Sequence, residues 1–173
     1  DLPDGGSGHW AKTVITIREH NPETTLETLI PDFQGNTEQL DRIISVHPEI
    51  VSHNIETVRR LTKEVRVQAK YDRSLFVLSY LKEKGMKTKS GIMCGMGEAE
   101  DEILETMHDL RTSGVGIITL GQYMQPTPRH LAVSEYVHPD TFLDYKNYGL
   151  DLGFTYIESG PLVRSSYHAE KHL

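Results

Sequence analysis

The feature that most constrains the fold is a pattern that occurs three times: a helical stretch ends at a glycine, and an apolar residue and a strand-like run follow at once. The three pairs are Gly85-Met86, Gly114-Val115 and Gly153-Phe154. Glycine readily adopts the left-handed conformation that closes a helix. The pairs lie 29 and 39 residues apart, a spacing comparable to the roughly 30 residues of one strand–helix–strand unit. We therefore expect an α/β fold with a mostly parallel sheet and right-handed crossovers.

Five short runs of apolar and β-favouring residues predict strands. They cover residues 26–30, 49–53, 87–93, 116–121 and 154–158. Helical periodicity predicts helices after the cap residue Asn36, with Gln39 placed to reach back, and over 58–61, 71–84, 102–111 and about 142–152. The first eight residues, rich in Gly and Pro, are predicted to be a loop. Five strands cannot close an eight-stranded barrel, so the sheet is either open or the later part of a larger barrel.

Composition limits the class of protein. A chain of 173 residues with 37% hydrophobic and 25% charged residues is typical of one globular domain, here residues 1–173. The net charge of −7 argues against nucleic acid as a partner. The single cysteine, Cys94, excludes an internal disulfide and a cluster held by this chain's cysteines alone. Without a long apolar run or a signal peptide, we expect no membrane association and a cytoplasmic location.

Ligands of parallel α/β sheets bind beyond the carboxyl ends of the strands, and the residues there are unusually polar in this sequence. Asp32, Asn54 and Glu56 offer donors and acceptors suited to hydroxyls and amines. Helix capping by Asn54 and Glu56 is an equally good interpretation at this point. His53 fits a core position as readily as a ligand position.

The run from Gly91 to Glu98 places three glycines and a carboxylate between a strand and a helix. Bare backbone allows a planar ligand to approach, and a helix start offers free N–H groups. The run has neither the ending of a phosphate loop nor the G-x-G-x-x-G spacing. Cys94 within it is predicted to be a packed side chain, because no basic neighbour in sequence would lower its pKa.

The tail from Arg164 to His168 combines a cation, two hydroxyls, a phenol and an imidazole. By composition alone it is as well explained by a surface loop. A serine hydrolase is a poor fit, because no G-x-S-x-G motif occurs in the chain.

Six motifs, in this order and spacing, resemble the lipoyl synthase family of radical S-adenosylmethionine (SAM) enzymes. They occupy residues 1–6, 30–33, 53–57, 89–93, 119–126 and 160–169. The resemblance covers essentially the whole chain, which corresponds to roughly the later half of a family member. It implies the later strands of a partial (β/α) TIM-like barrel of the radical SAM type, with a cluster-ligand tail at about 159–173.

The resemblance implies a sulfurtransferase that inserts two sulfur atoms into an octanoyl chain on a lipoyl-carrier protein domain. In that family one 4Fe-4S cluster, on C-x-x-x-C-x-x-C, cleaves SAM to a radical, and an auxiliary cluster on C-x-x-x-x-C-x-x-x-x-x-C supplies the sulfur. Neither cysteine motif is present here, so we expect the chain alone to be inactive. The expected partners are the octanoylated carrier domain and iron–sulfur cluster assembly proteins.

The resemblance also assigns residues. Ser166, the second serine of the Arg-Ser-Ser-Tyr run, matches the family's ligand to the auxiliary cluster, with Ser165 as the alternative. A hydroxyl oxygen suits iron less well than a thiolate does, so it could leave when iron must go. Arg164 beside it could favour an anionic oxygen.

The cofactor residues are assigned in the same way. The G-x-I-x-G-x-x-E pattern near the adenine matches Gly91, Met93 in place of isoleucine, Gly95 and Glu98. Asn54 and Glu56 are implied for the methionyl or ribose part of SAM, and Gln122 for the pocket edge.

Two other functions stay open. A non-catalytic α/β module that binds a carrier protein or nucleoside is favoured by the missing cysteines. A barrel isomerase or aldolase with Lys89 as Schiff base needs a desolvated lysine. In addition, a sheet edge exposed at residues 26–30 predicts that the isolated chain self-associates.

Overall fold

Five parallel strands form one sheet, as predicted, and they lie in it in sequence order. The computed structural model describes residues 2–172, so Asp1 of the first motif and Leu173 of the tail lie outside the described residues. The strands are β1 (Glu27–Leu29), β2 (Ile50–Ser52), β3 (Lys87–Cys94), β4 (Ile117–Gln122) and β5 (Tyr156–Gly160). Each lies within two residues of its predicted bounds.

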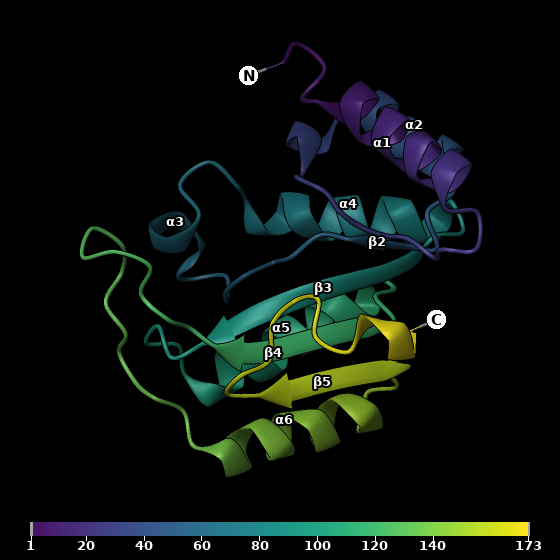
Figure 1. The fold of residues 1–173 in the computed structure, drawn as a ribbon. Coiled ribbons are helices and arrows are strands. Elements are labelled where there is room, and N and C mark those ends of the chain that lie inside the picture. Colours follow the sequence, from purple (N-terminus) through teal and green to yellow (C-terminus); the bar gives the residue numbers. More distant parts are fainter. Residues whose placement is uncertain (1, 173) are drawn as a thin grey trace.

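Helices lie around the outside of the curved sheet, and the C-terminal tail crosses its other face (Figure 1). The helices are α1 (Ser7–His20), α2 (Thr37–Ser45), α3 (Thr62–Val65), α4 (Tyr71–Glu83), α5 (Glu100–Thr112) and α6 (Pro139–Asp151), with 3-10 turns η1 (Phe33–Gly35) and η2 (Ala169–His172). The predicted cap of α2 is confirmed, because Asn36 Oδ1 accepts hydrogen bonds from the backbone of Glu38 and Gln39.

The repeated glycine signal is confirmed at all three positions. Gly85, Gly114 and Gly153 have φ values of 86°, 82° and 87°, in the left-handed region that closes a helix. The apolar residue after each glycine donates its N–H to a carbonyl five residues back, at 3.0, 3.1 and 3.2 Å. This bond turns the chain from α4, α5 and α6 directly into β3, β4 and β5.

One helix was not predicted from the sequence, and one predicted helix is wrong. Residues 2–6 form the predicted loop, but α1 already begins at Ser7 and has too few apolar residues for a clear stripe. Of its apolar residues, Trp10 and Val14 face inward. Gly6, with φ 86°, immediately precedes the helix. The helix predicted at 58–61 is a turn, and α3 begins only at Thr62.

The two faces of the sheet differ in polarity. Alternate side chains of a strand point to opposite faces. Ile92 and Cys94 of β3 and Ile118 of β4 pack on the helices in the main hydrophobic core. The inner face is polar: Gly91 is in register with Thr119, and Thr119 with Glu158. Across residues 2–172, no helix combines the length and apolarity needed to cross a membrane.

Candidate ligand-binding site at the carboxyl ends of the strands

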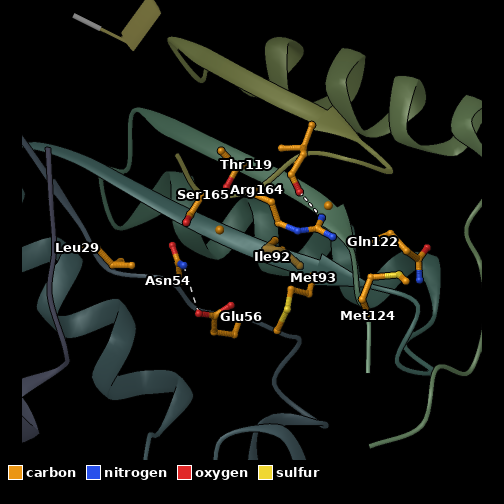
Figure 2. A pocket seen from close by; sticks show the side chains of 13 residues that line it. Leu29, Asn54, Glu56, Ile92, Met93, Thr119, Gln122, Met124, Arg164 and Ser165 are labelled. Atoms are coloured by element: carbon orange, nitrogen blue, oxygen red, sulfur yellow. Dashed lines mark hydrogen bonds between the residues drawn. The ribbon is translucent and has the colours of Figure 1, made fainter. Parts of the chain in front are cut away.

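A pocket of about 340 Å³ lies at the carboxyl ends of the strands, where ligands of parallel sheets bind. It is lined by Leu29, Asn54, Glu56, Gly91, Ile92, Met93, Thr119, Gly121, Gln122, Met124, Val163, Arg164 and Ser165. Figure 2 shows Asn54 and Glu56 on one side and Arg164 and Ser165 of the tail on the other. The pocket thus joins the loop after β2 to the tail, although about 110 residues separate them.

The backbone after β2 is bound to β3 and thereby fixes both polar side chains. Glu56 has a left-handed φ of 68°, which a side chain rarely adopts without a constraint. Its N–H donates to Gly91 O at 2.9 Å, and its carbonyl accepts from Met93 N at 2.8 Å. The Asn54 amide donates to Glu56 Oε1 at 3.2 Å. These bonds aim both side chains into the pocket.

Asn54 carries an acceptor without a partner. Among the residues that the structure describes, its Oδ1 is buried and makes no hydrogen bond. A buried unpaired acceptor costs about 1–3 kcal/mol, so a ligand donor there would be favoured. The alternative interpretation of Asn54 and Glu56 as helix caps is wrong, because the next helix begins only at Thr62.

Glycines leave room for a ligand on the pocket floor. A Cβ built on Gly91 would lie 2.9 Å from Thr119 Oγ1 and 3.0 Å from Asn54 Oδ1. Any side chain at this position would fill the space between two polar groups. A Cβ on Gly121 would lie 2.2 Å from the carbonyl oxygen of Val163, so this glycine lets the tail approach β4.

The charges in the pocket are of both signs. Burial raises the pKa of Glu56, while the hydrogen bond from Asn54 and the charge of Arg66 oppose that rise. Arg164 Nη1 donates to the carbonyl of Val163 at 2.7 Å, and its side chain is otherwise exposed. A carboxylate facing a guanidinium suits a ligand with both an ammonium and a carboxylate group.

Gly95 and Glu98 do not line the pocket but shape the loop beside it. The Glu98 carboxylate accepts from the N–H groups of Gly95 and Met96 at 2.5 and 2.9 Å. A Cβ on Gly95 would lie 2.3 Å from both Gln122 Nε2 and the carbonyl of Glu135. Gln122 itself lines the pocket and bridges to the segment before α6, since Nε2 donates to Glu135 O at 2.9 Å.

The two serines of the tail differ in position. Ser165 lines the pocket, whereas Ser166 is exposed and is not part of the pocket lining. The assignment of a cluster ligand to one or the other therefore stays a prediction.

Several predicted candidates have structural roles. Asp32 binds Arg73 at 2.7 Å and caps the turn at Gln34. His53 is buried, with its ring nitrogens 3.0 Å from Ile30 O and 2.9 Å from Ser74 Oγ. Cys94 is buried in the core, and burial raises the pKa of its thiol. The Lys89 ammonium donates to Glu27 Oε2 at 2.8 Å, and Lys89 does not line the pocket, which argues against a Schiff base there.

Part of the lining was missed from sequence. Leu29, Thr119 and Gly121 follow from strand register, since residues facing one side alternate along paired strands. Met124 lies two residues beyond the end of β4 and has no such register. The approach of Val163 to β4 could have been inferred from Gly121 only with knowledge of how the tail turns.

The fold and the pocket define a class of protein. The model of the radical SAM superfamily matches residues 6–110, which is more than half of the chain. The chain belongs to the radical SAM superfamily.

The chain is also similar in sequence to several lipoyl synthases. The chain is 63% identical over its whole length to the lipoyl synthase of Flavobacterium johnsoniae, covering 60% of that protein. It is equally 63% identical to the mitochondrial lipoyl synthase of Nematostella vectensis, again covering 60%. The lipoyl synthase of Treponema denticola is 51% identical. The chain thus spans about three fifths of the length of these relatives.

One solved structure supports the fold. The crystal structure of methylornithine synthase matches 91% of this chain and 54% of that chain, with a TM-score of 0.59 and 13% identity. At this identity the similarity concerns the fold, which agrees with a partial barrel of parallel strands.

Membership of the superfamily implies SAM and a 4Fe-4S cluster, and the residues present fit the first but not the second. The unpaired Asn54 Oδ1 and the open floor at Gly91 suit a small polar ligand such as SAM. A cluster needs several thiolates, whereas this sequence has one buried cysteine. Within the described residues, no three His, Cys, Asp or Glu side chains are grouped to hold a metal ion.

Proposed function

We propose that this chain is the part of a lipoyl synthase that forms the SAM pocket and the tail beside it. The complete protein would insert two sulfur atoms into an octanoyl chain bound to a carrier protein. One observation carries the proposal: the chain is 63% identical over its whole length to lipoyl synthases. Four of the six motifs, those at 53–57, 89–93, 119–126 and 160–169, also contribute residues to one pocket.

In this proposal the residues of the chain bind and orient the cofactor. Asn54 Oδ1 and the Glu56 carboxylate accept hydrogen bonds from the amine or ribose hydroxyls of SAM, and Arg164 faces its carboxylate. Gly91 and Met93 form the surface on which the adenine lies, and Gln122 closes the pocket edge. Gly95 and Glu98 keep the adjoining loop in place. Bound SAM supplies the radical chemistry of the superfamily.

We further propose that Ser166 is an oxygen ligand to a second 4Fe-4S cluster. Its exposure and its place next to the pocket residue Ser165 support this assignment. Arg164, two residues before it, would offset part of the cluster's negative charge. The thiolates for both clusters would come from the part of the protein outside these 173 residues.

The proposed partners are an octanoylated lipoyl-carrier domain and iron–sulfur cluster assembly proteins. The cytoplasmic location stays a prediction, and the mitochondrial name of the Nematostella vectensis relative gives an organelle as its alternative.

The test uses the full-length protein, reconstituted with iron and sulfide, incubated with SAM, a reductant and an octanoylated carrier domain. Mass spectrometry should show conversion of the octanoyl group to the lipoyl group. SAM binding without iron uptake and without turnover would instead favour a non-catalytic binding module.

Ser166→Ala tests the ligand assignment in the same protein. The variant should keep the SAM-cleaving cluster and lose or alter the auxiliary one, as seen in iron content and electron paramagnetic resonance. Ser165→Ala is the matched control. Unchanged spectra for Ser166→Ala with altered spectra for Ser165→Ala would transfer the role to Ser165.

A further inference from the structure

A buried polar cluster lies on the inner face of the sheet, apart from the pocket. Lys89 of β3 is 1% exposed, and its ammonium donates to Glu27 Oε2 of β1 at 2.8 Å. The other Glu27 oxygen accepts from Ser52 Oγ of β2 at 2.7 Å. Burying an ion pair is costly, so this pair calls for an explanation beyond packing.

The third member of the cluster comes from the C-terminal end of the chain. His172 in η2 is buried, and its Nδ1 lies 3.2 Å from Lys89 Nζ. Because a lysine ammonium has only donors, Nδ1 must be the acceptor and the ring is neutral with its proton on Nε2. Burial and the charge of Lys89 lower the pKa of His172, in agreement with a neutral ring. The ring also packs edge-on against Tyr156, with centroids 4.5 Å apart.

The chain before His172 runs the length of the inner face. It leaves β5 at its carboxyl end, where Gln122 N donates to Pro161 O at 3.4 Å, and passes Gly121 at Val163. It then returns to Tyr156, the first residue of β5. Figure 1 shows this yellow segment crossing β4 and β3 before the chain ends beside the start of β5. The segment is therefore held at two ends: by β4 at the pocket, and by His172 on Lys89.

We propose that Lys89, paired with Glu27, is a positioning residue that anchors the tail through His172, and so keeps Arg164 and Ser165 at the pocket. Between the two fixed ends, and within the part of the chain that the structure describes, the backbone of residues 164–171 makes hydrogen bonds only within this segment, as in Tyr167 N to Arg164 O and Lys171 N to His168 O. Such short turns do not hold a segment in place by themselves. The effect on the pocket, unlike the anchoring, rests on the proposed function.

The anchoring is tested by hydrogen–deuterium exchange of peptides covering residues 161–172 in the full-length protein. His172→Phe keeps an aromatic ring against Tyr156 but removes the acceptor for Lys89. The tail amides should exchange about tenfold faster or more, because a hydrogen bond to a charged group is lost. Lys171→Ala is the matched control, because Lys171 lies on the same turn and is exposed; its exchange should match the unchanged protein.

Lys89→Met and a double variant show whether the tail is released specifically or the whole fold is destabilised. Lys89→Met should also accelerate exchange of the tail, while the amides of β4 stay protected. If the two residues act as one unit, Lys89→Met with His172→Phe should exchange no faster than the faster single variant. Wild-type exchange in His172→Phe, or fully additive effects in the double variant, would overturn the anchoring. If Lys89→Met unfolds, His172→Phe against Lys171→Ala decides alone.

Ligand affinity tests the link to the pocket. In His172→Phe the affinity for S-adenosylhomocysteine, measured by calorimetry, should fall about tenfold, with Lys171→Ala unchanged. A mobile tail with unchanged affinity would support the anchor and contradict SAM as the ligand that the tail contacts. A tail that stays protected would contradict the anchor, whatever the ligand.

Discussion

Glu56 illustrates how this site trades stability for binding. Its backbone is held at a left-handed φ of 68° by bonds to β3, and its carboxylate lies in a partly buried pocket. The unpaired Asn54 Oδ1 beside it adds a second unfavourable group. Both costs are recovered when a ligand supplies donors, which is the pattern expected of a binding site.

Glu56→Gln should therefore stabilise the protein near neutral pH while it weakens ligand binding. Burial raises the pKa of Glu56 above its ordinary value of 4.5, so the folded state holds the proton more tightly than the unfolded state. The free energy of unfolding then falls as the pH rises from the ordinary pKa through the raised one. Glutamine lacks this term, so the variant should melt higher than the unchanged protein at about pH 7, and the gap should close below about pH 4.

Thermal melts across this pH range check the prediction, and calorimetry should show about a tenfold to hundredfold loss of SAM affinity in the same variant. Glu105→Gln is the control, because Glu105 is exposed in the middle of α5. A lower melting temperature for Glu56→Gln at neutral pH would contradict the burial argument.

The site residues predicted from the sequence fall into two groups: some line the pocket and others do not. Asn54, Glu56, Gly91, Met93 and Gln122, which the sequence predicts for the cofactor, all line the pocket. Arg164 also lines it, although the sequence predicts it only beside the cluster ligand. Asp32 was also a candidate, but Arg73, 41 residues away, pairs with it, and no local pattern shows such a contact. Gly95 and Glu98 support the loop beside the pocket instead. The Glu98 carboxylate is occupied by hydrogen bonds from the backbone N–H groups of Gly95 and Met96.

At the scale of elements, the tail lies so close to β4 at Gly121 that no side chain fits between them. Gly121→Ala would bring a Cβ to 2.2 Å from the carbonyl oxygen of Val163. Because backbone rather than a flexible side chain must move, the variant should lose about 1–3 kcal/mol of unfolding free energy and should displace the tail.

Chemical denaturation and exchange of residues 161–172 measure both effects. Gly116→Ala is the matched control, since its Cβ would meet Thr155 Oγ1 at an ordinary 3.6 Å. Equal stability of the two variants would show that the tail does not rest on β4 as described.

Elements with a strong local signal were predictable and those without it were not. The ends of the helices at Gly85, Gly114 and Gly153 were predictable, because glycine tolerates the positive φ that closes a helix. In contrast, α1 lacks a clear apolar stripe and forms against α2, where Arg42 reaches Ser7 at 3.2 Å. The helix predicted at 58–61 is wrong because the apolar residues Val58 and Leu61 are buried although the chain there forms a turn.

At the scale of the whole molecule, the sheet has an unpaired edge. Among residues 2–172, β1 pairs with β2 alone, and Leu29 at its end is 44% exposed. An unpaired edge beside exposed apolar surface favours pairing with another chain. We expect the isolated 173-residue chain to self-associate, with a sedimentation coefficient that rises with concentration. A compact monomer at high concentration would contradict this expectation.

The most direct test of the account is a calorimetric titration of SAM into the full-length, iron-reconstituted protein and into its Asn54→Ala, Glu56→Gln double variant. The account predicts one saturable site per chain in the unchanged protein and in Glu105→Gln. It predicts an affinity at least about a hundredfold lower in the double variant, because two acceptors of the ligand are lost. Equal affinity in the folded double variant would contradict the claim that the pocket at the carboxyl ends of these strands holds the cofactor.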